Sequence, residues 1–155
     1  MSDPKQILEA AQTILLVDWP NPGVPRSLLR AGFTVFSYSP DRYSAAEVVT
    51  EHPHDVDHEN VFPPRNEHDA GYLVFRPLAG RPEAVDIVNV YRPMEELSGI
   101  VINHVLPLGA KALWLQSPAP SAEVAEAHSL AREHGLVFIG GRDIAEIART
   151  LSDKE

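Results

Sequence analysis

Residues 85–93 read Val85-Asp-Ile-Val-Asn-Val-Tyr-Arg-Pro93, an apolar run that closes on an arginine and a proline. Similar short runs, rich in aliphatic and aromatic residues, lie at 13–17, 33–38, 72–75, 112–116 and 136–139. Most are continuous rather than alternating, as strands buried on both faces of a sheet require. Proline follows each of them except the last, which ends at Gly140 and Gly141.

Helical patterns separate these runs. Apolar residues recur at helical spacing in 4–11, 24–31, 94–106, 121–134 and 143–151. Asp3 is suited to cap the first of these helices, and Gly32 is suited to end the second. Strands that alternate with helices indicate βαβ units with right-handed crossovers. We therefore expect residues 1–155 to form a single α/β domain with a Rossmann-like, mostly parallel sheet and helices on both faces.

The segment from about 45 to 70 departs from this pattern. Ser44-Ala-Ala-Glu47 has capping-box spacing and predicts a short helix. The remainder, which includes Glu51-His-Pro-His-Asp-Val-Asp-His-Glu59, is interpreted as a polar insert. Its histidines lie among carboxylates, but their spacing matches no metal motif, and a solvated acidic loop explains them more simply. No metal site is predicted.

The composition narrows the classes of function. The 155 residues include 13 Lys or Arg and 22 Asp or Glu, giving a formal net charge of −9. This charge argues against binding to nucleic acid or to an anionic membrane. The chain has no cysteine, which excludes disulfides and thiol catalysis. With no secretory leader or membrane span expected, we predict a cytoplasmic protein.

Ligands of an open parallel sheet bind beyond the carboxyl ends of its strands. The candidate binding residues are those that end or follow the predicted strands. They are Asp18, Trp19, Pro20, Asn21, Pro25, Arg26, Ser37, Tyr38, Ser39, Pro40, Tyr91, Arg92 and Gln116.

Each of these candidates has an alternative structural role. Arg92 is the favoured phosphate ligand, since a guanidinium can clamp phosphate bidentately, but it could instead pair with Glu95 or Glu96. Arg26 could hold a phosphate at the start of the second helix. Asp18 could cap its loop, where a carboxylate would otherwise repel an anion.

Trp19 could instead cover the edge of the sheet. Gln116 could hydrogen-bond a ligand, although tying down a neighbouring loop is slightly favoured. Trp114 is expected in the core rather than against a ligand. Histidines 104, 128 and 134 are interpreted as helix-packing residues or helix-end partners.

Two motifs carry a resemblance to a known family. Residues 85–93 are similar to V-D-x-V-x-V-F-R, and Leu108-Gly-Ala-Lys-Ala-Leu-Trp-Leu-Gln116 is similar to G-A-K-x-x-W-x-Q. Both motifs are typical of the small stand-alone CoA-binding proteins, whose Rossmann-like fold also forms the CoA-binding domain of succinyl-CoA synthetase. The resemblance covers about 13–139 apart from the insert. Departures fall in the first loop, where Asp18-Trp-Pro20 replaces G-x-S, and at Gly140-Gly-Arg-Asp143.

The resemblance implies a protein that binds CoA or acyl-CoA as a non-catalytic carrier or sensor. Amides of the first loop and helix, with Arg26 and Arg92, would hold the phosphates, and residues 37–40 would frame the adenosine. No nucleophile or metal-hydrolase motif is present, and Asp18, Asp41 and Asp86 are scattered rather than paired.

Two alternatives remain open. One is an NAD(P)- or nucleotide-binding oxidoreductase or transferase subunit in which Asp41 would hold the ribose. The other is an interaction scaffold that has lost its ligand. The expected partner is thus a small nucleotide ligand, and the sequence does not indicate an oligomeric state.

Overall fold

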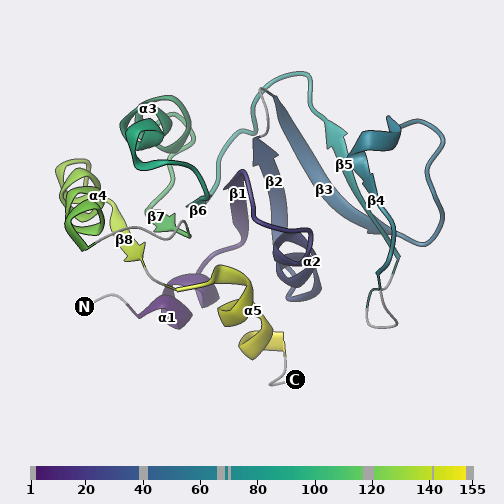
Figure 1. Ribbon diagram of the computed structural model, residues 1–155, viewed down its shortest axis with the longest axis horizontal. Coiled ribbons are helices and arrows are strands. Elements are labelled where there is room, and N and C mark those ends of the chain that lie inside the picture. Colours follow the sequence, from purple (N-terminus) through teal and green to yellow (C-terminus); the bar gives the residue numbers. More distant parts are fainter. Residues whose placement is uncertain are drawn as a thin grey trace.

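The computed structural model describes residues 3–38, 42–65, 69, 71–116, 121–140 and 142–152. Within these residues, eight strands form one sheet in the order β4-β5-β3-β2-β1-β6-β7-β8 (Figure 1). The strands are β1 (Thr13–Val17), β2 (Thr34–Tyr38), β3 (Tyr43–Val49), β4 (Val61–Phe62), β5 (Tyr72–Pro77), β6 (Ile87–Val90), β7 (Ala112–Leu115) and β8 (Val137–Gly140). The α-helices are α1 (Pro4–Glu9), α2 (Gly23–Arg30), α3 (Leu97–Ile100), α4 (Ser121–Glu133) and α5 (Ile144–Ser152). Short 3-10 helices are η1 (His58–Asn60) and η2 (Met94–Glu96), and η3 (Val101–Val105) is a π-helical turn.

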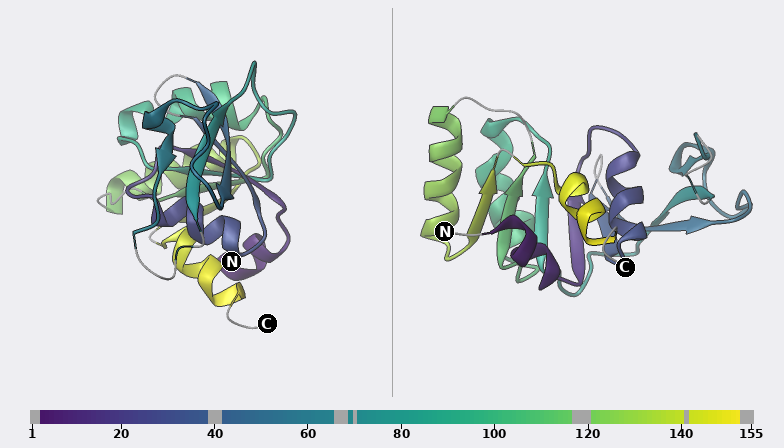
Figure 2. Two further views of the ribbon diagram at one scale, coloured as in Figure 1. Left: turned by 90° about the vertical axis from the view of Figure 1, so that its right-hand side faces the viewer. Right: turned by 90° about the horizontal axis from the view of Figure 1, so that it is seen from below.

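The centre of the sheet is parallel and covered on both faces. β2, β1, β6, β7 and β8 run parallel to one another. Leu15 and Val17 of β1 pack in the layer beneath α3, η3 and α4, whereas Ile14 and Leu16 pack in the layer beneath α1, α2 and α5. Figure 2 shows the helices on the two sides of the strands. Burial of these strands on both faces explains the continuous apolar runs in the sequence. The predicted α/β fold is confirmed.

The predicted helix ends are also present. The carboxylate of Asp3 accepts a hydrogen bond of 3.0 Å from the Lys5 amide. Gly32 adopts a φ of +98° just after α2, a conformation that glycine reaches without strain. The helical segment expected at 94–106 ends in η3, where the Leu106 amide donates to the Val101 carbonyl. Pro107 follows immediately and has no amide to continue the helix.

The short helix predicted at residues 44–47 is wrong, because these residues belong to strand β3. β3 pairs antiparallel with β2 at residues 43–45 and with β5 at residues 44–49. Its partner strand supplies backbone hydrogen bonds that outweigh a local capping pattern. The insert is therefore an antiparallel extension of the sheet, formed by β3, β4 and β5, and it projects at one end of the molecule (Figures 1 and 2).

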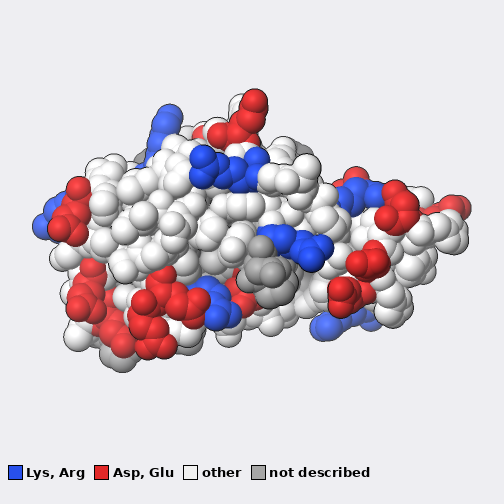
Figure 3. Space-filling model, turned by 90° about the horizontal axis from the view of Figure 1, so that it is seen from above, with Lys and Arg blue, Asp and Glu red and all other residues white. Residues whose placement is uncertain are grey.

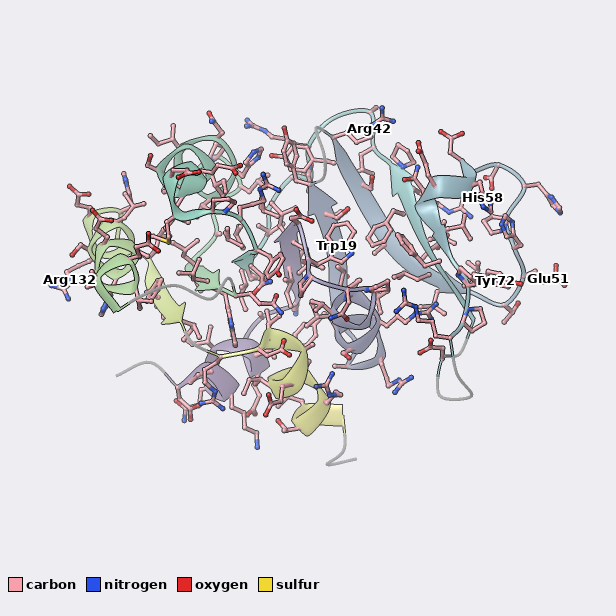
Figure 4. The ribbon with its side chains drawn as sticks, in the orientation of Figure 1. Trp19, Arg42, Glu51, His58, Tyr72 and Arg132 are labelled. Atoms are coloured by element: carbon pink, nitrogen blue, oxygen red, sulfur yellow. The ribbon has the colours of Figure 1, made fainter. Side chains whose placement is uncertain are left out.

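The loop of the insert folds back over this extension. The Arg76 guanidinium on β5 pairs with Glu47 on β3 and, at 2.9 Å, with Asp55 in the loop. His52 packs edge-on against Tyr72, with ring centroids 5.5 Å apart. Figure 4 shows His58, Glu51 and Tyr72 together at this end, well separated from Arg132 on α4. His52 and His58 thus lie on the extension rather than near the parallel strands.

The point where the chain changes direction lies between β1 and β6. From β1 the chain crosses to β2 on one side, and from β6 it crosses to β7 on the other. The carboxyl ends of β1 and β6 are adjacent, with Val17 paired to Val90. Such a switch point is where open α/β sheets bind ligands. None of the described helices has the length and apolar character needed to cross a membrane.

Candidate functional site

An ion pair closes the switch point. Asp18 follows β1 and Arg92 follows β6, and the Asp18 carboxylate lies 2.9 Å from Nη1 of Arg92. The same guanidinium donates to both carboxylate oxygens of Glu96, at 3.2 and 2.8 Å. Hydrogen bonds to Glu96 and then to Asp18 raise the pKa of Arg92 further above its already high usual value. Arg92 therefore makes the Glu96 pair that was the alternative from sequence, and it also makes a second pair with Asp18.

Asp18 has an unusual backbone. Its φ is +64°, in the left-handed region that residues other than glycine adopt only occasionally. Its Oδ1 accepts a hydrogen bond of 2.9 Å from the Trp19 amide, so the side chain caps its own loop. The left-handed turn directs the chain away from β1, and the carboxylate remains at the switch point. Asp18 therefore both shapes the loop and neutralises Arg92.

A first cavity of about 440 Å³ lies on one side of this ion pair. Its walls come from the ends of β1 and β2, from the ion pair and from the helical segment that follows β6. The lining residues are Val17, Asp18, Tyr38, Arg92, Glu96, Gly99, Ile100, Asn103 and His104. It has a charged end at Arg92 and an aromatic end at Tyr38 and His104, the combination that a nucleotide needs.

The aromatic end is a cluster of three rings. The ring centroids of Tyr38 and His104 are 4.1 Å apart, and Tyr43 packs edge-on against Tyr38 at 4.8 Å. The Tyr43 hydroxyl and Nδ1 of His104 share a hydrogen bond. Burial lowers the pKa of His104, which favours the neutral imidazole, and burial also raises the pKa of Tyr43. This wall is thus uncharged at neutral pH and suited to stacking against a planar base.

His104 was missed from sequence, where it was read as a packing residue. It lies in η3, and π-helical turns of this kind recur at functional sites. One signal for His104 was present in the sequence. This residue lies on the helical segment that follows β6, and that segment must pass over the switch point. Of the other two helix histidines, 128 and 134, His128 does pack, with its ring centroid 5.4 Å from that of Phe138.

A second cavity of about 460 Å³ lies on the other side of the ion pair. Asp18 and Arg92 line both cavities, so the ion pair forms the partition between them. The remaining wall comes from the exit of β6 and the start of α4, and consists of Tyr91, Pro93, Met94, Glu95 and Glu123. Tyr91, predicted from sequence, therefore belongs to this second cavity.

The first loop offers few free amides to a phosphate. The Gly23 and Val24 amides donate to Asn21, at 2.9 and 3.2 Å, and the Asp18 amide donates to the Tyr38 carbonyl at 3.3 Å. Pro20, Pro22 and Pro25 have no amide hydrogen. These amides are already bonded and the three prolines supply none, so the expectation that loop and helix amides hold phosphates stays a prediction that these contacts do not favour.

Arg26 is also engaged elsewhere. Its Nη1 donates to the Gly71 carbonyl at 2.9 Å, and its Nη2 donates to the carbonyls of Phe62 and Pro63. Only 8% of Arg26 is exposed, and it lines neither cavity. The predicted phosphate role is not supported by this position: Arg26 ties α2 to the β4–β5 turn.

Trp19 covers the sheet next to the site. Its ring stacks on Phe75 of β5, with centroids 4.7 Å apart and planes 20° from parallel. Figure 4 shows it between β1 and the extension. This is the structural alternative considered for Trp19, and it links the first loop to the insert.

Gln116 joins a partly buried polar network. It accepts a hydrogen bond of 2.6 Å from Asn89 and donates one of 3.1 Å to Asp143. Asp143 also caps α5 through the Ala145 amide. Gln116 therefore fastens β6 and β7 to α5, as its structural alternative predicted. Trp114 is fully buried and donates to the Arg142 carbonyl, so its expected place in the core is confirmed.

The remaining candidates are placed as follows. Ser37 is buried within β2, and Ser39 and Pro40 lie outside the described residues, as does Asp41. Among the residues described, no group of three or more His, Asp or Glu side chains is arranged to hold a metal. The structure thus brings together Asp18, Tyr38, Tyr91 and Arg92, and assigns Trp19, Arg26 and Gln116 to neighbouring contacts.

Comparison with protein families identifies the chain. The family described as "CoA binding domain" matches residues 31–145, which is most of the sequence. The chain belongs to this CoA-binding domain family. The match begins at Ala31, after β1 and the first loop, so it leaves out the departure at Asp18-Trp-Pro20 but includes the one at Gly140-Gly-Arg-Asp143. No curated protein and no solved structure gives a significant match.

Membership of the CoA-binding domain family confirms the resemblance drawn from residues 85–93 and 108–116. Both motifs lie within the matched range. They form β6 with its exit and β7 with the turn that precedes it. The family match thus includes Arg92, but neither β1 nor Asp18.

Proposed function

We propose that this CoA-binding domain binds CoA or an acyl-CoA at the β1–β6 switch point and acts as a non-catalytic carrier or sensor. The observation that supports this most is the place of Arg92. It lies at the switch point, lines both cavities and pairs there with the carboxylates of Asp18 and Glu96. A guanidinium binds phosphate bidentately in the same geometry as carboxylate, so a diphosphate is able to take the place of these partly exposed carboxylates.

The side chains at the two ends of the first cavity suggest how CoA would lie in it. Its diphosphate takes the Arg92 guanidinium, in place of Asp18, Glu96 or both. Its adenine lies against the uncharged wall formed by Tyr38 and His104. Because the loop amides are already bonded, Arg92 supplies most of the phosphate recognition in this chain.

The non-catalytic role is supported by how the polar groups of the first cavity are used. Asp18 and Glu96 are paired with Arg92, and His104 is bonded to Tyr43. None of these carboxylates is held as a base beside a nucleophile. An acyl-CoA incubated with the protein should therefore be recovered intact by chromatography, and release of free CoA would refute this role. The cytoplasmic location expected from the sequence stays a prediction.

The ligand class is tested by calorimetric titration with CoA, acetyl-CoA, NAD and NADP. We expect micromolar binding of CoA, and a loss of about tenfold or more in Arg92→Ala, since one charge-assisted phosphate contact is removed. Arg132→Ala is the matched control, because Arg132 is exposed on α4 and lines neither cavity. Tighter binding of NAD than of CoA would favour the oxidoreductase alternative. Binding of none of the four would favour a scaffold.

A further inference from the structure

The second cavity adjoins the proposed nucleotide cavity without any intervening element. Asp18 and Arg92 line both, so a ligand whose diphosphate is bound by Arg92 has one end in the first cavity and the other directed at the second. If the adenosine lies against Tyr38 and His104, the remaining part of CoA is its long, uncharged, thiol-bearing arm. The second cavity is the neighbouring space available to that arm.

The walls of the second cavity combine uncharged and acidic side chains. Tyr91, Pro93 and Met94 offer apolar surface, whereas Glu95 and Glu123 add carboxylates. Arg92 provides the positive charge among the lining residues, and its guanidinium is already within 3.2 Å of carboxylate oxygens of Asp18 and Glu96. The wall is therefore negatively charged overall.

The negative charge continues along the helices. Met94 and Glu95 also line a further cavity of about 390 Å³ between α3 and α4, which has Leu97 and Leu130 together with Glu126 and Glu133. Figure 3 shows Asp and Glu gathered toward this end of the molecule. An acyl chain that extends past the second cavity therefore meets apolar side chains flanked by carboxylates.

We propose that the second cavity receives the acyl-bearing arm of CoA and selects uncharged acyl groups over acyl groups that end in a carboxylate. This inference rests on the proposed function and names the class of acyl group that this site accepts. An uncharged chain contacts Met94 and its apolar neighbours at no electrostatic cost. A terminal carboxylate would be brought beside Glu95 and Glu123, and like charges repel most strongly where solvent is partly excluded.

The test compares two acyl-CoAs of equal chain length by calorimetry on the full chain. Butyryl-CoA should bind as tightly as CoA or more tightly, and succinyl-CoA should bind about tenfold more weakly than butyryl-CoA. Raising the salt concentration should reduce this difference, because part of the site is exposed. The double variant Glu95→Gln and Glu123→Gln should reduce it too, mainly by improving succinyl-CoA binding. Glu146→Gln on α5, which is exposed and lines neither cavity, is the control and should leave the ratio unchanged.

The outcomes separate this inference from the proposed function. Equal affinities for butyryl-CoA and succinyl-CoA, with CoA bound, would overturn the selection and leave CoA binding intact. Weaker binding of both acyl-CoAs than of CoA would overturn the placement of the arm in the cavity. If CoA and both acyl-CoAs fail to bind, the proposed function itself is overturned.

Discussion

The carboxylate of Asp18 and the guanidinium of Arg92, 74 residues apart in the chain, meet at 2.9 Å across the carboxyl ends of β1 and β6. This contact neutralises the cation that the proposed ligand needs. It also separates two cavities of similar size. The Asp18 carboxylate thus occupies the position on Arg92 that a phosphate oxygen would take. In the proposed complex the diphosphate replaces Asp18, Glu96 or both on Arg92, so at least one of these two ion pairs is exchanged.

Replacing Asp18 should therefore improve binding. In Asp18→Asn the amide oxygen can still accept from the Trp19 amide, and Asn tolerates a positive φ. The ion pair with Arg92 is lost and the repulsion between carboxylate and phosphate is removed. We expect roughly fivefold tighter CoA binding by calorimetry, with thermal stability nearly unchanged, since a partly exposed ion pair contributes little. Weaker binding in Asp18→Asn, with Glu146→Gln as wild-type-like control, would show that Asp18 assists the ligand.

Arg26 is expected to matter for stability rather than for binding. Arg26→Ala leaves the carbonyls of Gly71 and Phe62 without their donor and removes the partner of Asp69, 3.7 Å away. Because Arg26 is buried, we expect a loss of about 2–4 kcal/mol in the free energy of unfolding, measured with urea. CoA affinity of the folded variant should stay close to that of the wild type. A tenfold loss of affinity with unchanged stability would restore Arg26 as a phosphate ligand.

His104 should make stability depend on pH in a defined direction. Burial lowers its pKa in the folded protein, so the unfolded chain binds the proton more readily. Stability is therefore expected to rise with pH across the window between the lowered pKa and the usual value of about 6.5, and to be lost as the pH falls through it. Urea unfolding at several pH values should show a shallower dependence for His104→Gln than for the wild type. Proton NMR should show His104 titrating below the usual histidine pKa of about 6.5, and titration at or above that value would contradict this burial effect.

The Asn89–Gln116–Asp143 network should be structural. Asn89 is fully buried, and its Nδ2 donates to Gln116. Gln116→Ala removes that acceptor, and we expect a loss of about 1–3 kcal/mol in the free energy of unfolding. Replacing both Asn89 and Gln116 by Leu should recover part of this loss, because no buried donor is then left unpaired. An unchanged stability in Gln116→Ala would show that the network is not needed.

The parallel core was predictable because its strands are buried on both faces. Burial on both faces produces the mostly apolar runs at 13–17 and 85–91. The helix ends at Asp3 and Gly32 were predictable because their signals are local. The short helix predicted at residues 44–47 was wrong because capping-box spacing describes only local hydrogen bonds. The antiparallel pairing of β3 with β5, 29 residues apart at Ala46 and Phe75, decides the outcome there.

The sequence predicted the edge of the sheet at which the candidate site lies, but not the contacts between the residues of the site. Strand order places Asp18, Tyr38, Tyr91 and Arg92 at the same edge, and their positions after apolar runs indicate this. Whether Arg26 faces the edge or the insert depends on where the β4–β5 turn lies, which no local pattern reveals. The same holds for the pairing of Asp18 with Arg92 and for the approach of His104 to Tyr38.

A crystal structure of the protein with bound CoA tests the central proposal most directly. We expect a diphosphate oxygen within hydrogen-bonding distance of the Arg92 guanidinium, and the adenine against Tyr38 and His104. CoA bound at the opposite edge of the sheet, in the cavity lined by Lys5, Phe33 and Leu151, would refute the proposed site.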